Sequence, residues 1–340
     1  MKCFRCGREI TVHITRSAHS GYWSLDFCEH CSAAQASDCH DTCRCGVSFS
    51  AFLETGLLGC ENCYDVFSER LDALLVQYRG CATAQHEQVF EPKFGRIASV
   101  RTDELRDLLL IDDPLLDEKD FLSPEAIHKI DKIQNHTEKK IPRQKVRSLR
   151  IRMARNFSKI PYLQRMNHAQ KQILSSVLLS EKNVFSRWLF SKDVQIERTV
   201  YTGDEDHLRV QWITSYPEDH KKLYGVLDDI LTEINEIDRL YSWQFHKKYG
   251  YLTSCPGNSG TGIRISFKVD IGKLKEIGSW SLWKRNLKSS GLVVRGSKGE
   301  GSKETRIAEI SSINSWNFNL QEEFLKTSAM IERLNLAAEN

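Results

Sequence analysis

The segment YLTSCPGNSGTGIR, at residues 251–264, carries the densest pattern in this chain and leads directly into a run of alternating residues. From residue 263 to 269, isoleucine, isoleucine, phenylalanine and valine occupy every second position, and Arg264, Ser266 and Lys268 lie between them. A repeat of two is typical of a β-strand, so the run predicts a strand with one apolar face and one basic, polar face. Arg264 lies on the polar face, where its guanidinium can reach a ligand.

Two further segments predict strands. Leu208, Val210 and Trp212 alternate with polar residues, and GLVVR at 291–295 is a short apolar run before a glycine-rich turn. Together with the first strand and an intervening helical pattern, they indicate a mixed α/β domain from about residue 143 onward.

Two helices are predicted as well. Pro217-Glu218-Asp219 opens a run that we expect to continue to Gly250, because apolar residues recur in it at helical spacing. These are Leu223, Val226, Leu227, Ile230, Leu231, Ile234, Ile237 and Leu240. A serine followed by proline at 123–124 is a favourable helix start, which predicts a second helix to about Lys139.

Length and composition suit a globular protein of more than one domain. The chain has 340 residues, of which 40% are hydrophobic and 27% charged. Its longest aliphatic run is residues 108–111, so no segment is expected to cross a membrane. Because the first residues lack the apolar core of a signal peptide, we expect a cytoplasmic protein. The net charge of +3 is too close to balance to indicate nucleic acid.

Cysteines are distributed unevenly. Ten of the eleven lie between Cys3 and Cys81, and Cys255 stands alone. Without an export signal, thiolates on a metal are favoured over disulfides. Two Cys-x-x-Cys pairs, separated by residues 7–27, can supply four thiolates to a tetrahedral Zn²⁺, with free or redox-active thiols as the alternative. The predicted ligands are Cys3, Cys6, Cys28 and Cys31.

A second set of cysteines is less regular. Cys60 and Cys63 form a regular pair, but the segment upstream reads CHDTCRC at residues 39–45. Any two of Cys39, Cys43 and Cys45 can complete four ligands. We favour Cys43 and Cys45, which lie nearest to a regular pair, so that the second predicted zinc site comprises Cys43, Cys45, Cys60 and Cys63.

Four blocks follow one another in the C-terminal part: SLRIRMARN at 148–156, DEDHLR at 204–209, the segment 251–264, and RGSKGEGS at 295–302. In this order they resemble the phosphagen (ATP:guanido) kinases, and the third and fourth blocks resemble the protein-arginine kinase branch in particular. The resemblance spans about residues 143 to 325. It implies an α+β fold, an antiparallel sheet flanked by helices. The short interval between the first two blocks implies a shortened N-terminal lobe.

The resemblance also assigns roles to individual residues. Glu205 and Glu300 match the carboxylates that align a guanidinium and accept its proton. Cys255 matches a reactive cysteine, expected as a thiolate. His207 is placed with the cofactor-binding residues, with core packing as the alternative. Permanently charged, planar guanidinium groups suit ATP phosphates bridged by Mg²⁺. The arginines matching that clamp are Arg150, Arg152, Arg209, Arg264 and Arg295.

Residues 1 to about 81 resemble the small zinc-finger activator protein of the bacterial protein-arginine kinase system. The similarity rests on CFRC at 3–6, FCEHC at 27–31 and LGCENCY at 58–64. Three parts are therefore expected: a tandem zinc-binding region at 1–81, a partly helical connector at 82–142 and a guanidino-kinase-like domain at 143–340.

Together the resemblances imply a protein-arginine kinase fused to its own zinc-binding activator module. The implied partners are proteins with exposed arginines, a Clp ATPase and a stress-response repressor. The alternative is a catalytically inactive adaptor that binds phosphoarginine proteins, a Clp ATPase or a repressor. Residues 139–159 are strongly basic, a pattern also found in nucleic-acid-binding proteins. Since the first kinase block supplies three of these arginines, we favour ATP phosphates over nucleic acid as the partner of this basic run.

Overall fold

The computed structural model describes residues 12–18, 21–27, 42–79, 96–109, 148–180, 189–191, 194–202, 205–215, 220–296, 304–312 and 320–339. The helix predicted from residue 123 to 139 lies outside these residues.

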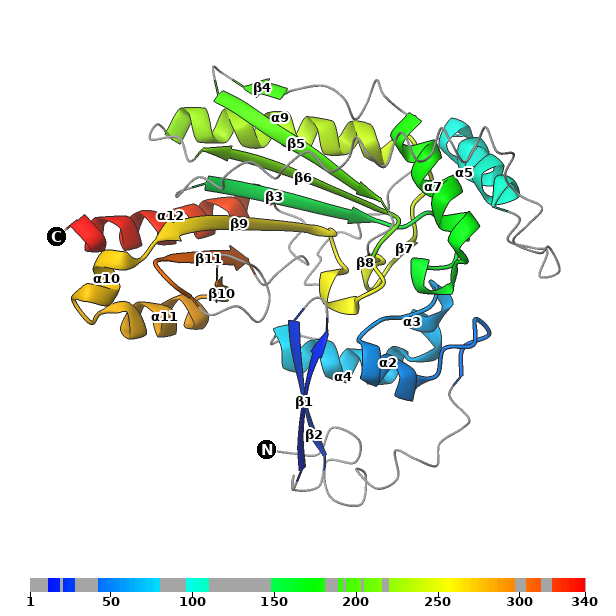
Figure 1. The fold of residues 1–340 in the computed structure, drawn as a ribbon, viewed down its shortest axis with the longest axis horizontal. Helices are drawn as coiled ribbons and strands as arrows, with labels where there is room; N and C mark the ends of the chain where they lie inside the picture. The colour runs from blue at the N-terminus through cyan, green and yellow to red at the C-terminus, as the bar shows by residue number, and fades with distance from the viewer. Residues whose placement is uncertain are drawn as a thin grey trace.

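One antiparallel sheet organises the C-terminal part of the chain (Figure 1). Its strands are β3 (Ser148–Arg155), β4 (Leu189–Ser191), β5 (Val194–Thr202), β6 (Leu208–Ser215), β9 (Ile263–Asp270), β10 (Leu292–Gly296) and β11 (Ile307–Ser312). The seven strands follow the order β10-β11-β9-β3-β6-β5-β4, and every neighbouring pair is antiparallel. The predicted antiparallel sheet and α+β class are confirmed.

Helices cover the apolar face of this sheet. The register places Ile265, Ile151 and Trp212 in one row across β9, β3 and β6, and all three are buried. Helix α9 (His220–Asp238) packs on this face, where Trp212 Nε1 donates to Glu233 at 2.7 Å. Helix α12 (Leu320–Glu339) packs beside it, since the Phe324 ring lies 6.1 Å from that of Phe267. The alternation of apolar residues in the sequence therefore predicted the buried face of the sheet correctly.

Helix α9 ends earlier than predicted, at Asp238 instead of near Gly250. The backbone that follows the helix pairs with residues 156–158 instead. The Ser158 amide donates to the Ser242 carbonyl at 2.9 Å, and the Gln244 amide donates to the Asn156 carbonyl at 2.8 Å. A helix cannot make these bonds, so tertiary pairing overrides the periodicity. Two short strands follow, β7 (Phe245–His246) and β8 (Gly250–Tyr251).

Shorter helices surround the sheet. They are α5 (Arg96–Leu108), α7 (His168–Ser180), α10 (Gly272–Glu276) and α11 (Trp280–Ser289), with 3-10 turns η3 (Leu163–Arg165) and η4 (Pro256–Asn258). Within the part of the chain that the structure describes, no helix is long and apolar enough to span a bilayer.

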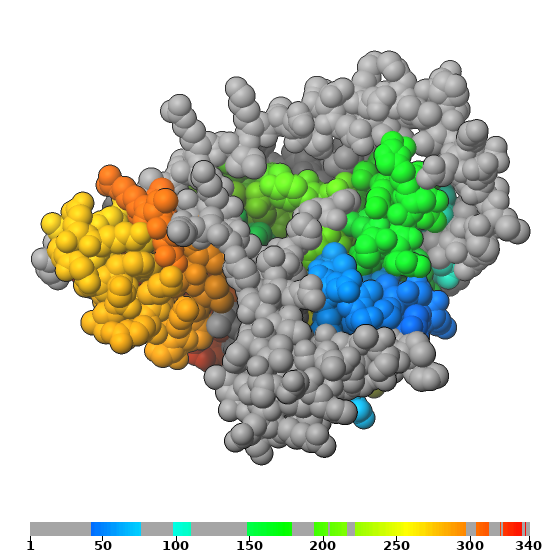
Figure 2. Space-filling model, turned by 60° about the horizontal axis from the view of Figure 1, so that its bottom comes forward, coloured from blue at the N-terminus to red at the C-terminus, as the bar shows by residue number. Residues whose placement is uncertain are grey.

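The N-terminal part contains a hairpin and a compact helical unit. The hairpin pairs β1 (Val12–Ala18) with β2 (Gly21–Phe27). We call residues 42–79 the cysteine unit; it holds α2 (Phe49–Thr55), α3 (Asn62–Val66) and α4 (Ser68–Arg79). Figure 2 shows the cysteine unit, in blue, beside the green surface of residues 148–180. A backbone hydrogen bond of 3.0 Å from Tyr162 to Gly59 joins the two.

Candidate functional site

The polar face of the sheet gathers all five arginines predicted to hold nucleotide. Residues on this face alternate with the buried residues, and the register aligns Arg152 directly opposite Arg264. Arg150 lies one row further along β3, facing Ser266. By the same alternation, Arg209 of β6 and Arg295 of β10 lie on this face. Four strands therefore contribute cations to one surface.

These guanidinium groups are close enough to disfavour one another's charge. Burial and the neighbouring charges of Arg150, Arg264 and Arg295 lower the pKa of Arg152 to about 9. Like charges directly opposite each other weaken a sheet, so folding alone gives no reason for this arrangement. A polyanion bound among them would remove the repulsion, which is what a nucleotide phosphate chain does.

Glu309 is the carboxylate inside this cluster, and sequence reasoning missed it. The residue lies on β11, is 2% exposed and forms ion pairs with Arg150 and, at 3.5 Å, with Arg152. Burial opposes ionisation of Glu309, but the charges of the two arginines hold its pKa below the usual value. Glu309 therefore orients both arginines. The one feature of the sequence that could have indicated Glu309 is that it is the only acidic residue of β11, whose other residues are apolar or serine.

Glu205 lies at the edge of the same face, against Arg209. Arg209 Nη2 is 2.5 Å from Glu205 Oε2 and 3.0 Å from Asp206 Oδ2, and Arg209 Nε donates to the same Asp206 oxygen at 3.1 Å. Asp206 is fully buried and also accepts from the Asn156 side chain at 2.9 Å. This network fixes one predicted catalytic carboxylate beside one predicted phosphate-binding arginine.

The segment that opened the sequence analysis is held by a buried arginine. Arg155 forms a two-pronged ion pair with Asp238 at 2.7 and 3.0 Å, and its guanidinium lies 3.6 Å from the centre of the Tyr251 ring. Gly262, with φ 64°, passes so close that a Cβ there would lie 2.6 Å from Arg155 Nη1. Beyond it, Arg264 Nη2 donates to Asn258 Oδ1 at 3.0 Å, which aims the guanidinium along the turn.

His207 and Cys255 are both fully buried. The His207 Nδ1 atom accepts from the Phe157 amide at 3.0 Å, and Nε2 donates to the Pro161 carbonyl at 2.8 Å. Burial lowers the pKa of His207 to about 4, so the ring is neutral. These contacts correspond to the core-packing alternative for His207. Cys255 packs in a hydrophobic cluster shared with the cysteine unit, and its reactivity stays a prediction.

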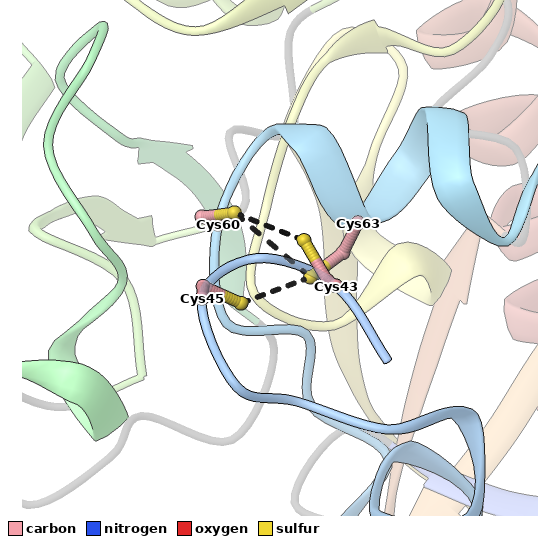
Figure 3. A group of neighbouring side chains, drawn as sticks. All are labelled: Cys43, Cys45, Cys60 and Cys63. Atoms are coloured by element: carbon pink, nitrogen blue, oxygen red, sulfur yellow. Dashed lines mark hydrogen bonds between the residues drawn. The ribbon is translucent and has the colours of Figure 1, made fainter. Parts of the chain in front are cut away.

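Four sulfur atoms meet in the cysteine unit (Figure 3). The Sγ atoms of Cys43, Cys45, Cys60 and Cys63 all lie within 4.8 Å of one another. Three of the separations are 3.7, 3.5 and 4.0 Å. A tetrahedral zinc with bonds of about 2.3 Å requires sulfurs about 3.8 Å apart, so the four residues fit the metal. Hydrogen bonds from Cys45 and Cys63 lower the pKa of Cys60, and the same contacts raise the pKa values of Cys45 and Cys63, so the sulfurs are close enough to share protons.

Several predicted site residues lie outside the described part of the chain. They are Glu300, the second predicted carboxylate, together with Cys3, Cys6, Cys28 and Cys31, the first predicted zinc ligands. Cys39, the alternative ligand of the second site, lies outside it too. Their roles stay predictions.

Comparisons with known proteins match both parts of the chain. The family model of the ATP:guanido phosphotransferase C-terminal catalytic domain matches residues 132–330. The model of the McsA central zinc-finger domain matches residues 41–87, which includes the four clustered cysteines. Among solved structures, a lombricine kinase superposes with a TM-score of 0.52 at 17% identity, covering 88% of this chain and 87% of that one. At that identity the likeness concerns the fold alone.

The curated relatives include bacterial proteins named protein-arginine kinase. A protein-arginine kinase of Clostridium kluyveri is 29% identical over 46% of this chain and 55% of its own length. A protein-arginine kinase of Clostridium acetobutylicum is 33% identical over 44% of this chain and 43% of its own length. The chain thus spans about half the length of these relatives. The family model covers more than half of the chain. On this basis, the chain belongs to the ATP:guanido phosphotransferase family.

Proposed function

We propose that this chain is a cytoplasmic protein-arginine kinase that transfers the γ-phosphoryl group of ATP to arginine side chains of proteins. The observation that carries the proposal is the convergence of five arginines on one sheet face, with Glu205 at its edge. The relatives named protein-arginine kinase support the choice of substrate.

In this reaction, a guanidino nitrogen of the acceptor bonds to the γ-phosphorus while the bond from phosphorus to the β,γ-bridging oxygen breaks. ADP leaves, and the acceptor loses one proton. Glu205, which is paired with Arg209, would align the acceptor and take that proton. Arg150, Arg152 and Arg264 would hold the phosphate oxygens and neutralise the charge that develops on them.

Two metals complete the proposal. Mg²⁺ would be bound together with ATP and would supply positive charge that neutralises part of the phosphate charge. Zn²⁺ would be held by Cys43, Cys45, Cys60 and Cys63, and also by the first predicted cysteine set. A five-residue α3 is too short to be stable without support, so the metal would fix the fold of the cysteine unit. Because the unit belongs to the same chain, it acts on the kinase domain at high effective concentration.

The direct test is incubation with ATP, Mg²⁺ and an arginine-rich protein, followed by analysis of acid-labile phosphate and by mass spectrometry. Phosphoarginine is expected with the wild type and is expected to fall at least about a hundredfold with Glu205→Gln or Glu300→Gln. Glu322→Gln is the matched control, since that carboxylate is exposed on α12 and pairs with Lys326. Free arginine in place of protein tests the acceptor class.

The inactive adaptor is the competing function. The ion pair that ties Glu205 to Arg209 is the observation that favours it, because it occupies the predicted base. ATP binding without phosphoarginine, in wild type and control alike, would replace the kinase proposal with the adaptor.

We extend the proposal to stress response and Clp-protease targeting, with a Clp ATPase and a stress-response repressor as partners. Its support is the resemblance to the protein-arginine kinase branch. Capture of either partner by the wild type, compared with Glu205→Gln, tests whether the association depends on phosphorylation.

A further inference from the structure

A single hydrophobic cluster joins the cysteine unit to the kinase-like domain. Within the unit it contains three of the four clustered cysteines together with Phe52, Leu58, Tyr64 and Phe67. Four buried residues of the C-terminal part complete it: Tyr162, Tyr249, Leu252 and Cys255. The predicted metal site therefore shares a core with the residue predicted to be the reactive thiol.

Polar contacts concentrate at the two residues before Cys255. The Leu58 amide donates to the Ser254 carbonyl at 2.8 Å. The Tyr64 hydroxyl donates to the Thr253 carbonyl at 2.8 Å and accepts from the Thr253 amide at 3.4 Å. The backbone of two consecutive residues of the kinase-like domain is thus held by the cysteine unit.

The same short segment contacts the catalytic edge from its other side. The Ser254 amide donates to Asp206 Oδ1 at 2.8 Å, and the Ser254 hydroxyl donates to the Glu205 carbonyl at 2.8 Å. Since Asp206 also binds Arg209, Ser254 connects the cysteine unit to the Glu205–Arg209 pair through direct hydrogen bonds.

Both contacting groups of the cysteine unit lie next to its sulfur ligands. Leu58 is two residues before Cys60, and Tyr64 directly follows Cys63. Metal ligation would fix the turn at 58–64 and with it the directions of the Leu58 amide and the Tyr64 hydroxyl. The guanidinium of Arg165 lies next to the four-cysteine site. A Cβ at Gly46 would lie 3.0 Å from Arg165 Nη2, so this guanidinium is packed on the loop between Cys45 and Val47. A tetrathiolate zinc carries net negative charge, which Arg165 would offset.

We propose that Tyr64 is a positioning residue that couples order at the four-cysteine site to the 253–255 segment and, through Ser254, to Glu205. With metal bound, the segment is held on both sides; without it, the contacts from Leu58 and Tyr64 would loosen while those of Ser254 to Asp206 and Glu205 remain. The catalytic consequence rests on the proposed kinase function, whereas the structural coupling does not.

The chain supplies a matched pair of variants. Tyr64→Phe removes the hydroxyl that binds Thr253. Tyr162→Phe removes a hydroxyl that is equally buried in the same cluster but has no hydrogen-bond partner within the described residues. Both variants keep an aromatic ring and all cysteines, so bound zinc should equal the wild-type content in each.

The readout is hydrogen exchange of the Ser254 amide, measured by NMR, because this amide binds Asp206 and makes no bond to Tyr64. Loss of one buried hydrogen bond predicts exchange faster by about threefold to tenfold in Tyr64→Phe and within about twofold of wild type in Tyr162→Phe. Zinc removal from the wild type by a chelator should accelerate the same amide at least as much. An unchanged Ser254 amide in both zinc-free wild type and Tyr64→Phe overturns the coupling.

Activity gives the second readout. Tyr64→Phe should lower kcat about tenfold or less and leave KM for ATP within about twofold, since the arginine face is not touched. A rise in KM with constant kcat would contradict a positioning role. If the wild type makes no phosphoarginine, the kinase proposal fails, and the exchange of Ser254 still decides the coupling.

Discussion

Arg209 Nη2 lies 2.5 Å from Glu205 Oε2, while Nε and Nη2 of the same guanidinium reach a single oxygen of buried Asp206. One arginine is therefore oriented by two consecutive residues of the loop before β6. A lysine has one ammonium group and cannot reproduce this two-sided contact. Arg209→Lys should lower kcat/KM about a hundredfold in the phosphoarginine assay, with thermal unfolding shifted only slightly. Activity near the wild-type level would show that only the positive charge is needed.

Glu309 allows a test of the arginine cluster that measures stability and ATP binding and does not depend on phosphoryl transfer. Glu309→Gln leaves Arg150 and Arg152 without their buried carboxylate, which should lower the free energy of unfolding by about 3 kcal/mol. Saturating ATP should restore much of that loss, because phosphates supply the missing negative charge. Urea unfolding with and without ATP measures both effects. Equal losses in the two conditions would place the phosphates away from these arginines.

Removal of one sulfur ligand should be visible in the metal content. Cys60→Ser is expected to lower bound zinc by about one equivalent per chain and to destabilise the cysteine unit. Cys255→Ser, the control, should keep the full zinc content, since Cys255 lies outside the four-sulfur group. Elemental analysis of both purified variants gives the result. Equal zinc in wild type and Cys60→Ser would exclude Cys60 as a ligand.

His207 predicts a pH dependence of stability. Its folded pKa of about 4 lies below the ordinary value of 6.5, so the unfolded chain binds a proton more readily. The contribution of His207 to the free energy of unfolding is fully present above about pH 6.5. It decreases as the pH drops toward 4, by about 3 kcal/mol over the whole interval. Urea unfolding at several pH values should show a smaller acid loss in His207→Gln than in the wild type. Parallel curves would mean that His207 is not buried neutral.

The sequence predicted elements that depend on a local pattern. The strand around Arg264 was correct because alternation reports directly on which side chains face a core. The end of α9 was missed because its cause is a contact with residues 156–158, some 80 positions earlier in the chain. The periodic apolar residues continue past Asp238, and nothing local marks the change.

The same distinction holds for the candidate site. Cys43, Cys45, Cys60 and Cys63 could be chosen from spacing, since the chemistry of zinc prescribes paired ligands. Glu309 could not, because its role depends on a register that carries arginine side chains across β9 to reach it. Contacts of Leu58 and Tyr64 with the 253–255 segment leave no sequence pattern either, since their partners are peptide groups that every residue has.

The cationic surface depends on the alternation of side chains along each strand. A deletion inside a strand therefore has different effects when it removes an odd or an even number of residues. Removing one residue within β3 would turn Arg150 and Arg152 into the space beneath the helices and bring their apolar neighbours outward. Removing two would merely slide the same alternation along the sheet. Length changes in the stretches between strands carry no such penalty, so insertions and deletions in descendants of this gene should accumulate there and be rare inside β3 and β9.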